Sequence, residues 1–537
     1  MSPNIPDAAP ATETVGLAQP LPAAIADRPA LLGAQTLTYR ELTDRVEAFA
    51  AALAAIAAGP GERVAIWLEK QPAYVVAILG TLRAGCAYVP LDAAQPPSRV
   101  ETILVDSEPV ALVTDQAHLA AVAGRMLPKS IRTIVVDGDA EAVTPAGGPR
   151  VETWEEFAAR ASAPAAPPPT DGTTLAAVLY TSGSTGVPKG VMISHGSLAN
   201  FVGWARAEMH LGPDDVFANH ASFTFDLSTF DLFAALSAGA ALWVISDREQ
   251  RDVSALAEGI ARHGVTVWYS VPSILRLLTA SGALTAEAAR SLRYVLFAGE
   301  VFPITHLRAL TDLLPADVAL YNLYGPTETN VCTYHRVTPA DLSREQPVPI
   351  GLPITRTRAS ILDADGRALT GPDAVGELVI EGDCVTPGYW GRGGEPIAAQ
   401  HRDHRHPTGD IVSLEQGRFV YRGRKDRMVK LSGYRVELGE VEAAVLRHPQ
   451  VEEAAVVVRH NGERSQLTLY YTSRDAADRP SLLELKRHCA RFLPAYMVPH
   501  AATCLDALPR NANGKTDYRR LADEPATPVA VPASTTQ

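Results

Sequence analysis

Short apolar runs alternate with amphipathic stretches along most of the chain. Residues 41–58 repeat apolar positions at helical spacing, and residues 63–67 form a short apolar run typical of a buried strand. Alternation of this kind predicts helices packed against a parallel or mixed sheet. We therefore expect an α/β fold.

Proline-rich and charged stretches mark the boundaries of the predicted domains. Residues 160–172 form a proline-rich linker, and the charged run 422–427 precedes a last part with a predicted helix at 438–446 and a predicted strand at 453–459. Both ends are rich in Ala, Pro and Thr without apolar periodicity, so we expect them to be disordered. The expected domains are a disordered tail at 1–15, a large α/β core of several subdomains with mixed sheets at 16–425, a small α+β domain at 426–523 and a disordered tail at 524–537.

Composition and charge narrow the range of functions. The 537 residues are 47% hydrophobic and 20% charged, which is enough apolar material for a large core. Lys and Arg number 48 against 60 Asp and Glu, and the net charge of −12 disfavours binding to a nucleic-acid backbone. The five cysteines are scattered without CxxC spacing, and we find neither a signal peptide nor an apolar run of about 18 residues. We expect a soluble, cytoplasmic protein with reduced thiols and no membrane partner.

A loop rich in glycine and hydroxyl residues follows the apolar run 174–180, which we predict to be a buried strand. The loop reads TSGSTGVPKG, with three glycines and four hydroxyl residues between Thr181 and Gly190. Its backbone N–H groups can converge on an anion, and Lys189 adds a positive charge, so the loop suits a polyphosphate. It is not a Walker loop, because Lys189 lies between Pro188 and Gly190. The alternative is a flexible turn without a ligand.

The extended loop YTSGSTGVPKG resembles the phosphate loop of the adenylate-forming ligases, which include acyl-CoA synthetases, luciferases and the adenylation domains of nonribosomal peptide synthesis. The likeness continues through nearly the whole chain. Its further segments are LTYREL (37–42), AGCAYVPLD (84–92), NLYGPTET (322–329), GELVIEG (376–382), TGD (408–410), GRKDRMVKLSGYRVELGEVE (423–442) and NANGK (511–515). The resemblance implies an enzyme that uses ATP and Mg²⁺, with a large N-terminal core and a mobile C-terminal lid domain.

The resemblance also assigns residues to the nucleotide. It implies phosphate contacts for Thr181, Ser182, Gly183, Ser184, Thr185, Gly186 and Lys189, of which Thr181 and Lys189, like the magnesium ligand Glu328, also take part in catalysis. It further implies adenine contacts for Asn322 and Tyr324, a phosphate contact for Thr327, and ribose contacts for Asp410 and Arg424. The residue types fit, since an aromatic ring can stack on a base and carboxylates bind Mg²⁺ or accept hydrogen bonds. From spacing alone, Asp410 would be a surface carboxylate and the Tyr-Gly-Pro sequence a structural turn.

Residues of the C-terminal domain are also assigned by resemblance. Asp426 is similar to the hinge about which this domain rotates, and Gly433 and Tyr434 are similar to the hairpin that lines the pantetheine tunnel. Lys515 resembles the lysine that offsets the negative charge built up during adenylation. Without the family pattern, Asp426 and Lys515 would be solvated surface charges.

The segment FDLSTF (225–230) resembles the motif that supplies the substrate pocket of amino-acid-activating adenylation domains. Asp226 takes the position that pairs with the substrate α-ammonium, because a buried carboxylate needs a positive partner. The alternative role is a helix N-cap. The family's pocket positions correspond here to Asp226, Leu227, Phe230, Tyr269, Leu296, Ala298, Leu323, Val331, Cys332 and Lys515.

Apart from Asp226, Lys515 and the Tyr269 hydroxyl, these pocket positions are apolar, so we expect a small uncharged side chain in the substrate. The set resembles that of freestanding prolyl-activating enzymes, which load L-proline onto a peptidyl carrier protein for oxidation to a pyrrole unit. Phe230 stands where leucine is expected and makes the pocket shallower. Since the chain has neither a carrier attachment motif nor a condensation motif, we expect its partner to be a separate phosphopantetheinylated carrier protein.

Alternatives of two kinds stay open. Within enzymes, these are activation of another small aliphatic amino acid or of a proline analogue, and a CoA ligase of a small carboxylic acid. Outside enzymes, the alternative is a nucleotide-binding or carrier-docking module without activity, although functional residue types fill the positions of Glu328, Asp410 and Lys515. No side-chain nucleophile is needed, so we expect Cys332 to be a packing residue.

Overall fold

The computed structural model describes residues 23–122, 125, 127–138, 148–160, 168, 170–183, 186–372, 374–461, 464–475, 478–510 and 516–523. Contacts divide the chain into two units. The first unit contains Met1–Ala93, Leu104–Tyr180 and Gly190–Lys425, and the second contains Ala94–Ile103, Thr181–Lys189 and Asp426–Gln537. The predicted tails at 1–15 and 524–537 lie outside the described residues.

One sheet of the first unit has nine strands in the order β16-β15-β14-β13-β12-β10-β11-β1-β2. These strands are β1 (Pro29–Leu32), β2 (Leu37–Thr38), β10 (Val216–Asn219), β11 (Ala241–Val244), β12 (Val267–Ser270), β13 (Tyr294–Phe297), β14 (Ala319–Tyr324), β15 (Thr333–Arg336) and β16 (Leu352–Pro353). The strands from β1 to β14 in this order run parallel, whereas β2, β15 and β16 pair antiparallel. The carboxyl ends of the parallel strands thus share one edge, where open α/β sheets bind ligands.

A second sheet has seven strands in the order β7-β6-β5-β3-β4-β8-β9. These are β3 (Arg63–Trp67), β4 (Ala87–Leu91), β5 (Ala111–Asp115), β6 (Thr133–Asp137), β7 (Arg150–Thr153), β8 (Leu175–Thr181) and β9 (Lys189–Ser194). The pairings from β7 to β8 are parallel, and β3, β4 and β5 are almost wholly buried, as expected for a sheet covered on both faces. The strands predicted at 63–67 and 174–180 are confirmed as β3 and β8.

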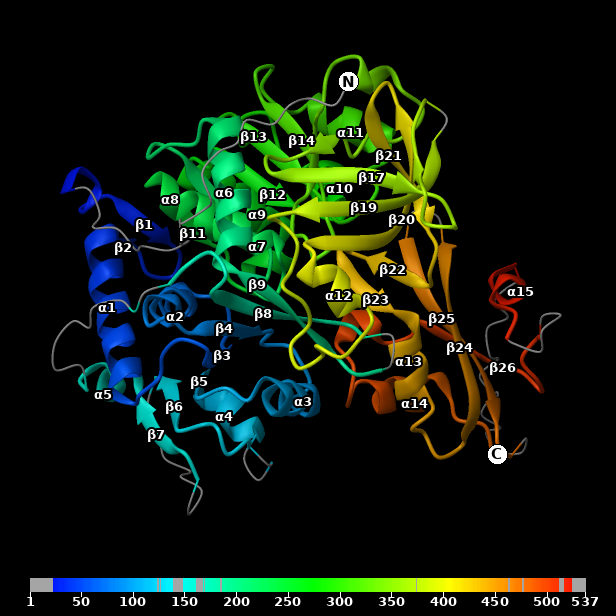
Figure 1. Ribbon diagram of the computed structural model, residues 1–537, viewed down its shortest axis with the longest axis horizontal. Helices are drawn as coiled ribbons and strands as arrows, with labels where there is room; N and C mark the ends of the chain where they lie inside the picture. Colours follow the sequence, from blue (N-terminus) through cyan, green and yellow to red (C-terminus); the bar gives the residue numbers. More distant parts are fainter. Residues whose placement is uncertain are drawn as a thin grey trace, which may run out of the picture. The chain divides into compact units, whose positions relative to one another are not determined.

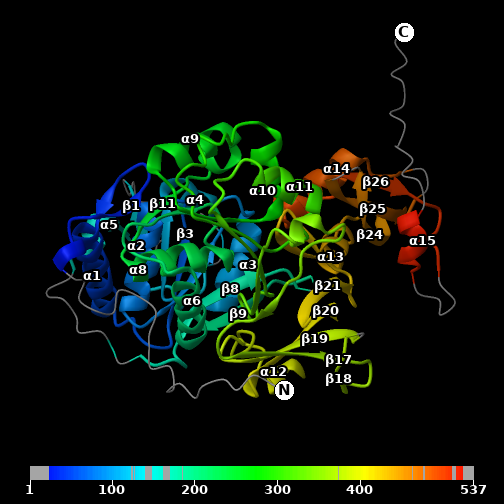
Figure 2. The same ribbon diagram turned by 90° about the horizontal axis from the view of Figure 1, so that it is seen from above.

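Two helices near the N-terminus lie side by side in Figures 1 and 2. Helix α1 (Tyr39–Ala55) packs on α2 (Pro72–Arg83), and α2 packs on β3 and β4. Thr38 and Glu41 form a capping box, so α1 covers 39–55 rather than the predicted 41–58. Helix α2 is buried on nearly all sides, which explains its continuous apolar sequence.

The other helices up to Lys425 are shorter than α1 and connect the strands. They are α3 (Pro97–Ser107), α4 (Gln116–Val122), α5 (Trp154–Ala158), α6 (His195–Met209), α7 (Leu227–Thr229), α8 (Ala235–Ala238), α9 (Val253–His263), α10 (Pro272–Ala280), α11 (Ile304–Thr311), α12 (Ile397–Arg402) and 3₁₀ turns at Ala23–Ile25, Glu249–Arg251 and Asp341–Ser343. A π-helix, Phe230–Ala234, joins α7 to α8. Such wide turns are rare and often lie at functional sites.

A third, five-stranded sheet completes the first unit in the order β18-β17-β19-β20-β21. Its strands are β17 (Thr357–Leu362), β18 (Ala368–Leu369), β19 (Val375–Gly382), β20 (Arg405–Glu415) and β21 (Arg418–Arg424). All pairings are antiparallel, and β20 pairs with β21 up to Asp410 opposite Arg424. This sheet therefore holds the TGD segment and the end of the first unit in one register.

The C-terminal segment of the second unit is a small α+β fold (Figure 1). Its elements are β22 (Met428–Leu431), β23 (Tyr434–Glu437), α13 (Leu438–Val445), β24 (Val451–Asn461), β25 (Arg464–Ser473), α14 (Leu482–Cys489), a 3₁₀ turn (Ala495–Met497), β26 (Ala501–Cys504) and α15 (Tyr518–Asp523). Val441 of α13, Val456 of β24 and Leu469 of β25 meet in a fully buried core. The predicted helix at 438–446 and strand at 453–459 are confirmed, and so is the α/β fold class with a smaller C-terminal part.

Candidate active site

The predicted adenine turn begins where β14 ends at Tyr324. A Cβ atom at Gly325 would lie 1.5 Å from the carbonyl oxygen of Asn330, so the turn closes on itself only with glycine there. The chain then returns alongside β14, where the Cys332 N–H donates to the Tyr324 carbonyl (2.9 Å). The turn therefore fixes both Tyr324 and Glu328, which it contains.

Three residues expected to contact the nucleoside meet in one hydrogen-bonded chain in the first unit. The Tyr324 hydroxyl donates to Asp410 Oδ2 (2.5 Å), and Arg424 Nη1 donates to Asp410 Oδ1 (2.7 Å). Asp410 is 2% exposed, and a buried carboxylate needs a positive partner. The ion pair with Arg424 provides it. Burial, followed by the charge of Asp410, raises the pKa of Tyr324 well above its usual value, so this hydroxyl stays a donor.

Asn322 lies two residues before Tyr324 on β14, so both side chains point to the same face of the sheet. Its Nδ2 donates to the carbonyl of Pro349 (2.8 Å), and the residue is buried. The structure thus brings Asn322, Tyr324, Asp410 and Arg424 together in the first unit, as a shared nucleoside site requires.

Glu328 is fully buried, as expected for a functional carboxylate and not for a surface one. Its Oε1 accepts a hydrogen bond from the Tyr389 hydroxyl (2.6 Å), and its backbone carbonyl accepts from Thr386 N–H (2.7 Å). Thr327, beside it, is partly exposed. Among the residues that the structure describes, no cluster of three or more His, Cys, Asp or Glu could hold a metal by itself.

The phosphate loop belongs to the second unit, and Ser184 and Thr185 lie outside the described residues. A Cβ atom at Gly183 would lie 1.9 Å from the Val187 carbonyl oxygen, and Gly186 has a φ of +82°, so both positions require glycine. Thr181 Oγ1 is buried with no hydrogen-bond partner among the described residues. An unpaired buried hydroxyl fits a residue whose partner is a ligand.

The loop makes hydrogen bonds with other residues of the second unit. The Gly183 N–H donates to Glu440 Oε2 (3.0 Å), and the Ser182 hydroxyl donates to the Arg435 carbonyl (2.8 Å). A carboxylate is the kind of acceptor that converging loop N–H groups take. Lys189 follows as the first residue of β9.

The remaining predicted residues of the second unit lie at the start of its C-terminal segment, except for Lys515, which is outside the described residues. Asp426 is the first residue of the C-terminal segment, and its Oδ1 accepts from Met428 N–H (3.2 Å). Gly433 has a φ of +82° in the turn between β22 and β23, and the Tyr434 ring stacks on Tyr496 at 3.8 Å. Gly433 and Tyr434 therefore form a tight, supported hairpin tip.

Asp226 stands at the N-terminus of α7, but its side chain makes no capping hydrogen bond. Asp226 therefore occupies the N-cap position, as the alternative predicted, but its carboxylate does not cap the helix. Asp226 is partly buried, and its charge is one cause of the raised pKa of Tyr269. An acid kept close to a buried tyrosine without a capping role fits the binding of a substrate cation.

Parallel strands arrange the apolar pocket residues. Tyr269 of β12 is in register with Leu296 of β13, and Leu323 lies on β14, the next strand. One hydrophobic cluster contains most of the predicted pocket, namely Leu227, Phe230, Tyr269, Leu296, Ala298, Leu323 and Val331. Cys332 is buried in a different cluster, next to Tyr324, because neighbouring residues of the returning chain face opposite sides.

Tyr269 and Phe230 pack against each other within this cluster. Their rings meet edge to face at 5.4 Å, and both residues are almost fully buried. The Tyr269 hydroxyl has no hydrogen-bond partner among the described residues, although it is buried. Burial, followed by the charges of Asp226 and Asp231, raises its pKa well above the usual value. The hydroxyl therefore stays protonated and can act as a donor.

Sequence reasoning missed two residues that hold this site. Asn330, directly after the PTET segment, has a φ of +51°, and its Nδ2 donates to Thr229 Oγ1 of α7 (2.8 Å). Tyr389 orients Glu328 from a distant loop. A non-glycine residue in the left-handed region leaves no mark on a single sequence, although Asn is a residue type that tolerates it.

In the described part of the chain, no helix is long and apolar enough to cross a bilayer. All five cysteines are free, and four of them are buried. Burial raises the pKa of Cys86 to about 12 and the pKa of Cys384 to about 11, so these thiols are poor nucleophiles at neutral pH.

Known proteins resemble the chain along most of its length. The family model of AMP-binding enzymes matches residues 22–390, and that of the AMP-binding enzyme C-terminal domain matches residues 440–515. The chain is 61% identical to an L-proline–[L-prolyl-carrier protein] ligase of Streptomyces coelicolor, over 94% of this chain and 95% of that protein. A protein of the same name from Pseudomonas fluorescens is 42% identical, over 90% and 94%. The solved adenylation domain AlmE of Vibrio cholerae, in complex with glycyl-adenosine-5'-phosphate, is similar with a TM-score of 0.79 and 26% identity, over 93% and 95%. The chain therefore belongs to the AMP-binding enzyme family.

Proposed function

We propose that the protein activates L-proline with ATP and transfers the prolyl group to the phosphopantetheine thiol of a separate carrier protein. The observation that supports this most is the apolar cluster that follows Asp226 in the chain, which contains Leu227, Phe230 and a buried Tyr269 whose hydroxyl has no hydrogen-bond partner among the described residues. Such a site suits a small apolar amino acid, whose ammonium pairs with the carboxylate of Asp226. Two relatives at 61% and 42% identity are named for the same reaction.

The first half-reaction is an in-line displacement at phosphorus. A carboxylate oxygen of proline bonds to the α-phosphorus of ATP, the bond from that phosphorus to the bridging oxygen breaks, and pyrophosphate leaves as prolyl-AMP forms. The protein needs no nucleophile for this step and contributes position and charge. In the second half-reaction the thiol sulfur bonds to the prolyl carbonyl carbon, AMP leaves, and the thiol proton is lost to solvent.

Nucleotide contacts follow the assignments made by resemblance. We propose that the 181–189 loop holds the phosphates, that Asn322 and Tyr324 contact adenine, and that Asp410 and Arg424 hold the ribose. The buried Asp410 supports this, because its charge is already balanced by Arg424 and its position is fixed by the Tyr324 hydroxyl.

We propose Glu328 as the carboxylate that binds Mg²⁺, and its residue type fits the ion. Mg²⁺ is usually bound by one or two carboxylates together with substrate phosphates and water. Glu328 is buried and oriented by Tyr389, as a metal-binding carboxylate is commonly held by a neighbour. Bound there, Mg²⁺ would neutralise charge on the phosphates.

For the C-terminal domain we propose that Asp426 is the hinge, that Lys515 acts in adenylation, and that Gly433 and Tyr434 line the way of the pantetheine arm. The division of the chain between Lys425 and Asp426 supports a hinge at this position. The five free cysteines favour a reducing compartment such as the cytoplasm. Oxidation of the prolyl thioester to a pyrrole unit stays a prediction that only the resemblance supports.

Pyrophosphate exchange with single amino acids tests the proposal. Wild-type protein should exchange pyrophosphate with L-proline well above pipecolate, valine and alanine, and Asp226→Asn should lose most of this exchange because it keeps the shape and removes the charge. Equal exchange with proline and alanine would reject proline specificity. A thioester formed with CoA and not with a carrier protein would favour the CoA ligase, and ATP binding without any exchange would favour a module without activity.

A further inference from the structure

A buried lysine lies where the carboxyl ends of β3 and β10, from the two large sheets of the first unit, come together. Lys70 belongs to the loop between β3 and α2 and is only 4% exposed. Its Nζ donates to the backbone carbonyls of Asn219 (2.8 Å) and His220 (3.0 Å) at the end of β10. Burying an ammonium group is costly unless its contacts compensate for lost water. The two hydrogen bonds therefore attach the loop after β3 to the end of β10.

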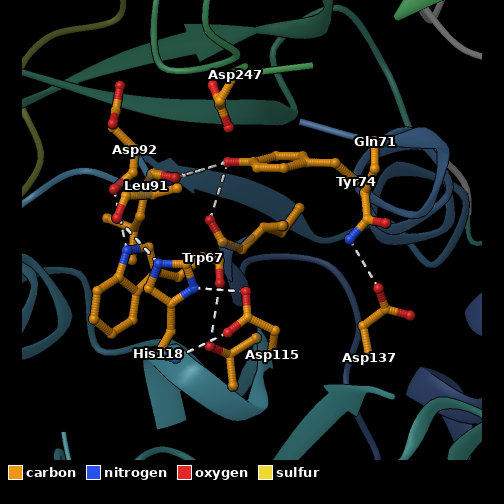
Figure 3. Close-up of polar contacts among 12 residues, drawn as sticks. Trp67, Gln71, Tyr74, Leu91, Asp92, Asp115, His118, Asp137 and Asp247 are labelled. Carbon is orange, nitrogen blue, oxygen red and sulfur yellow. Dashed lines mark hydrogen bonds and ion pairs between the residues drawn. The ribbon is translucent and has the colours of Figure 1, made fainter. Parts of the chain in front are cut away.

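Acidic side chains around the loop provide the rest of the compensation. The backbone N–H of Lys70 donates to Asp247 Oδ2 (2.9 Å). The negative charges of Asp247, Asp231 and Asp92 favour the charged form of the Lys70 side chain. Burial still lowers the pKa of Lys70 from 10.5 to about 8. Figure 3 shows Asp92 and Asp247 together with Trp67 of β3, which precedes this loop. The lysine is thus held within a fixed polar frame.

The two carbonyls that Lys70 binds begin the segment that leads to Asp226. Residues 220–225 connect β10 to Asp226 without a helix or strand of their own. Near the start of this segment, Asn219 Oδ1 and His220 Nε2 are buried and have no hydrogen-bond partner among the described residues. The lysine therefore supplies a long-range anchor where these side-chain atoms do not.

Within this segment, Phe223 gives a second point of contact with the same region. Lys70 Nζ lies 5.8 Å from the centre of the Phe223 ring, and that ring lies 4.8 Å from the ring of Tyr74 on α2. The Tyr74 hydroxyl is itself fixed by the backbone of Ile66 and Leu91 at the ends of β3 and β4 (Figure 3). The segment thus rests against a rigid part of the seven-stranded sheet.

A further link runs from the end of β10 to the π-helix. Asn219 Nδ2 donates to Asp231 Oδ2 (3.2 Å) and to the Ala221 carbonyl (3.2 Å). Asp231 is 1% exposed and directly follows Phe230, a residue of the apolar pocket. Asn219 is therefore held by Lys70 through its carbonyl, and it holds the π-helix through its side chain.

We infer that Lys70 is a positioning residue for recognition of the amino acid, because its bonds to the Asn219 and His220 carbonyls set where Asp226 lies. This inference rests on the proposed function. A residue that acts through the segment before Asp226 changes the binding of the amino acid. It leaves the proposed ribose contacts, Asp410 and Arg424, as they are, because these residues lie on β20 and β21 of the five-stranded sheet.

The test measures pyrophosphate exchange by full-length Lys70→Met and Lys70→Arg proteins, with Lys129→Met as the matched control because Lys129 is exposed. Lys70→Met should raise the proline KM about tenfold or more, since two hydrogen bonds from a charged donor to buried carbonyls are lost. The KM for ATP should change by less than about twofold, which separates this role from a general loss of structure. Lys70→Arg keeps the charge and the donors and should recover most of the proline affinity.

Two results would overturn the inference. One is a proline KM of Lys70→Met equal to that of Lys129→Met, and the other is an equal rise in the KM of proline and of ATP. If Lys70→Met does not fold, Lys70→Gln takes its place, because its amide can still donate to one carbonyl. If the wild-type protein shows no exchange with proline, the proposed function fails on its own, and the same variants are compared with the amino acid that supports exchange.

Discussion

Tyr269 brings a hydroxyl into a cluster of apolar side chains, and the described residues offer it no hydrogen-bond partner. A buried polar atom without a partner costs about 1–3 kcal/mol in folding. A site of this kind is stable enough to exist and gains when a ligand supplies the missing acceptor. For the proposed substrate, we expect an oxygen of the proline carboxylate to be that acceptor.

Replacing Tyr269 by Phe should therefore separate stability from binding. We expect Tyr269→Phe to be as stable as the wild type or more stable by about 1 kcal/mol, because it removes an unsatisfied hydroxyl. Its proline KM should rise about three- to tenfold, the usual worth of one hydrogen bond. Urea unfolding and pyrophosphate exchange measure the two effects.

Tyr39 provides the matched control for this substitution. It is also fully buried, but its hydroxyl donates to the Ala240 carbonyl (2.7 Å). Tyr39→Phe should lose stability and keep the proline KM. A Tyr269→Phe protein that loses stability as Tyr39→Phe does, with an unchanged KM, would show that the Tyr269 hydroxyl has no role in binding.

At this scale the sequence predicted residues within motifs and missed their distant partners. Tyr324, Asp410 and Arg424 were found because each lies in a short segment typical of the family, and the structure joins them. The bond from Tyr389 to Glu328 joins residues 61 positions apart, and that from Asn330 to Thr229 joins residues 101 positions apart. Such pairs depend on how the strands are ordered in a sheet, which periodicity does not reveal.

Among the elements, the turn after β14 and helix α7 are joined through Asn330. Its backbone has a φ of +51°, and its side chain reaches Thr229 of α7 while its Oδ1 accepts from the Val331 N–H (3.0 Å). The turn that contains Glu328 and the helix that begins after Asp226 therefore share one fixed point.

Two substitutions at Asn330 test this join. Asn330→Gly keeps the left-handed backbone and loses the side-chain bonds, whereas Asn330→Ala loses the bonds and also strains the backbone by about 1–2 kcal/mol. We expect both proteins to be less stable than the wild type in urea unfolding, with Ala the less stable of the two. Equal stability of Gly and Ala would show that the backbone conformation imposes no cost.

A histidine and an aspartate join the end of β5 to the start of α4 (Figure 3). His118 Nδ1 lies 2.7 Å from Asp115 Oδ2, and its ring lies 4.4 Å from that of Trp67. Burial disfavours the charged imidazole, but the hydrogen bond and charge of Asp115 outweigh burial and raise the pKa of His118. The Asp115 pKa is lowered: burial opposes this shift, and the hydrogen bonds and charge of His118 outweigh it.

The signs of these shifts predict a pH dependence of stability. Stability from a raised histidine pKa is fully present below its unfolded value of about 6.5 and is lost as pH rises through the folded value. His118→Phe, which keeps a ring beside Trp67, should therefore cost more unfolding free energy at pH 6 than at pH 9. In an Asp115→Asn background this difference between the two pH values should vanish. An equal cost at both pH values in the wild-type background would contradict the assignment.

Element types were more predictable than element ends. The helix predicted at 41–58 begins at Tyr39 because Thr38 and Glu41 form a capping box, which the apolar pattern does not register. The π-helix at Phe230–Ala234 was not predicted, since an apolar stretch such as FDLFA has the same composition in a regular helix. Strands β3 and β8 were found because buried parallel strands form continuous apolar runs.

For the molecule as a whole, we expect Lys515 of the second unit to act in the first half-reaction and not in the second. Lys515→Ala should slow formation of prolyl-AMP by about 10²–10³-fold, the usual loss when a charge-stabilising group is removed. Transfer from supplied prolyl-AMP to the carrier thiol should change little. Exchange assays and single-turnover loading of the carrier protein measure the two steps.

Arg510→Ala is the control for this substitution, because Arg510 is an exposed cation of the same unit, paired with Glu453 of β24. It should leave both steps close to the wild-type rates. An equal loss of both steps in Lys515→Ala would remove Lys515 from the adenylation step.

The division of the chain into a large α/β part and a small C-terminal part was predictable, because alternating apolar runs give way to a charged stretch at 422–427. The grouping of Ala94–Ile103 and Thr181–Lys189 with the C-terminal segment was not. Both are loops or helix ends, and their contacts with residues hundreds of positions away follow from packing and not from local pattern.

The chain leaves the first unit through a short, heavily bonded stretch. Arg424 pairs with Asp410, the Lys425 N–H donates to the Gly409 carbonyl (3.0 Å), Lys425 Nζ pairs with Glu377 (2.6 Å), and the second unit resumes at Asp426. Strand β21, which ends at the proposed ribose contact Arg424, therefore also leads into the C-terminal segment. Thermodynamic linkage is reciprocal. If a change in the direction in which the chain leaves β21 alters the affinity for the nucleotide, then nucleotide binding alters the equilibrium between those directions by the same factor. ATP would then shift the conformational equilibrium of the C-terminal domain in addition to being a reactant.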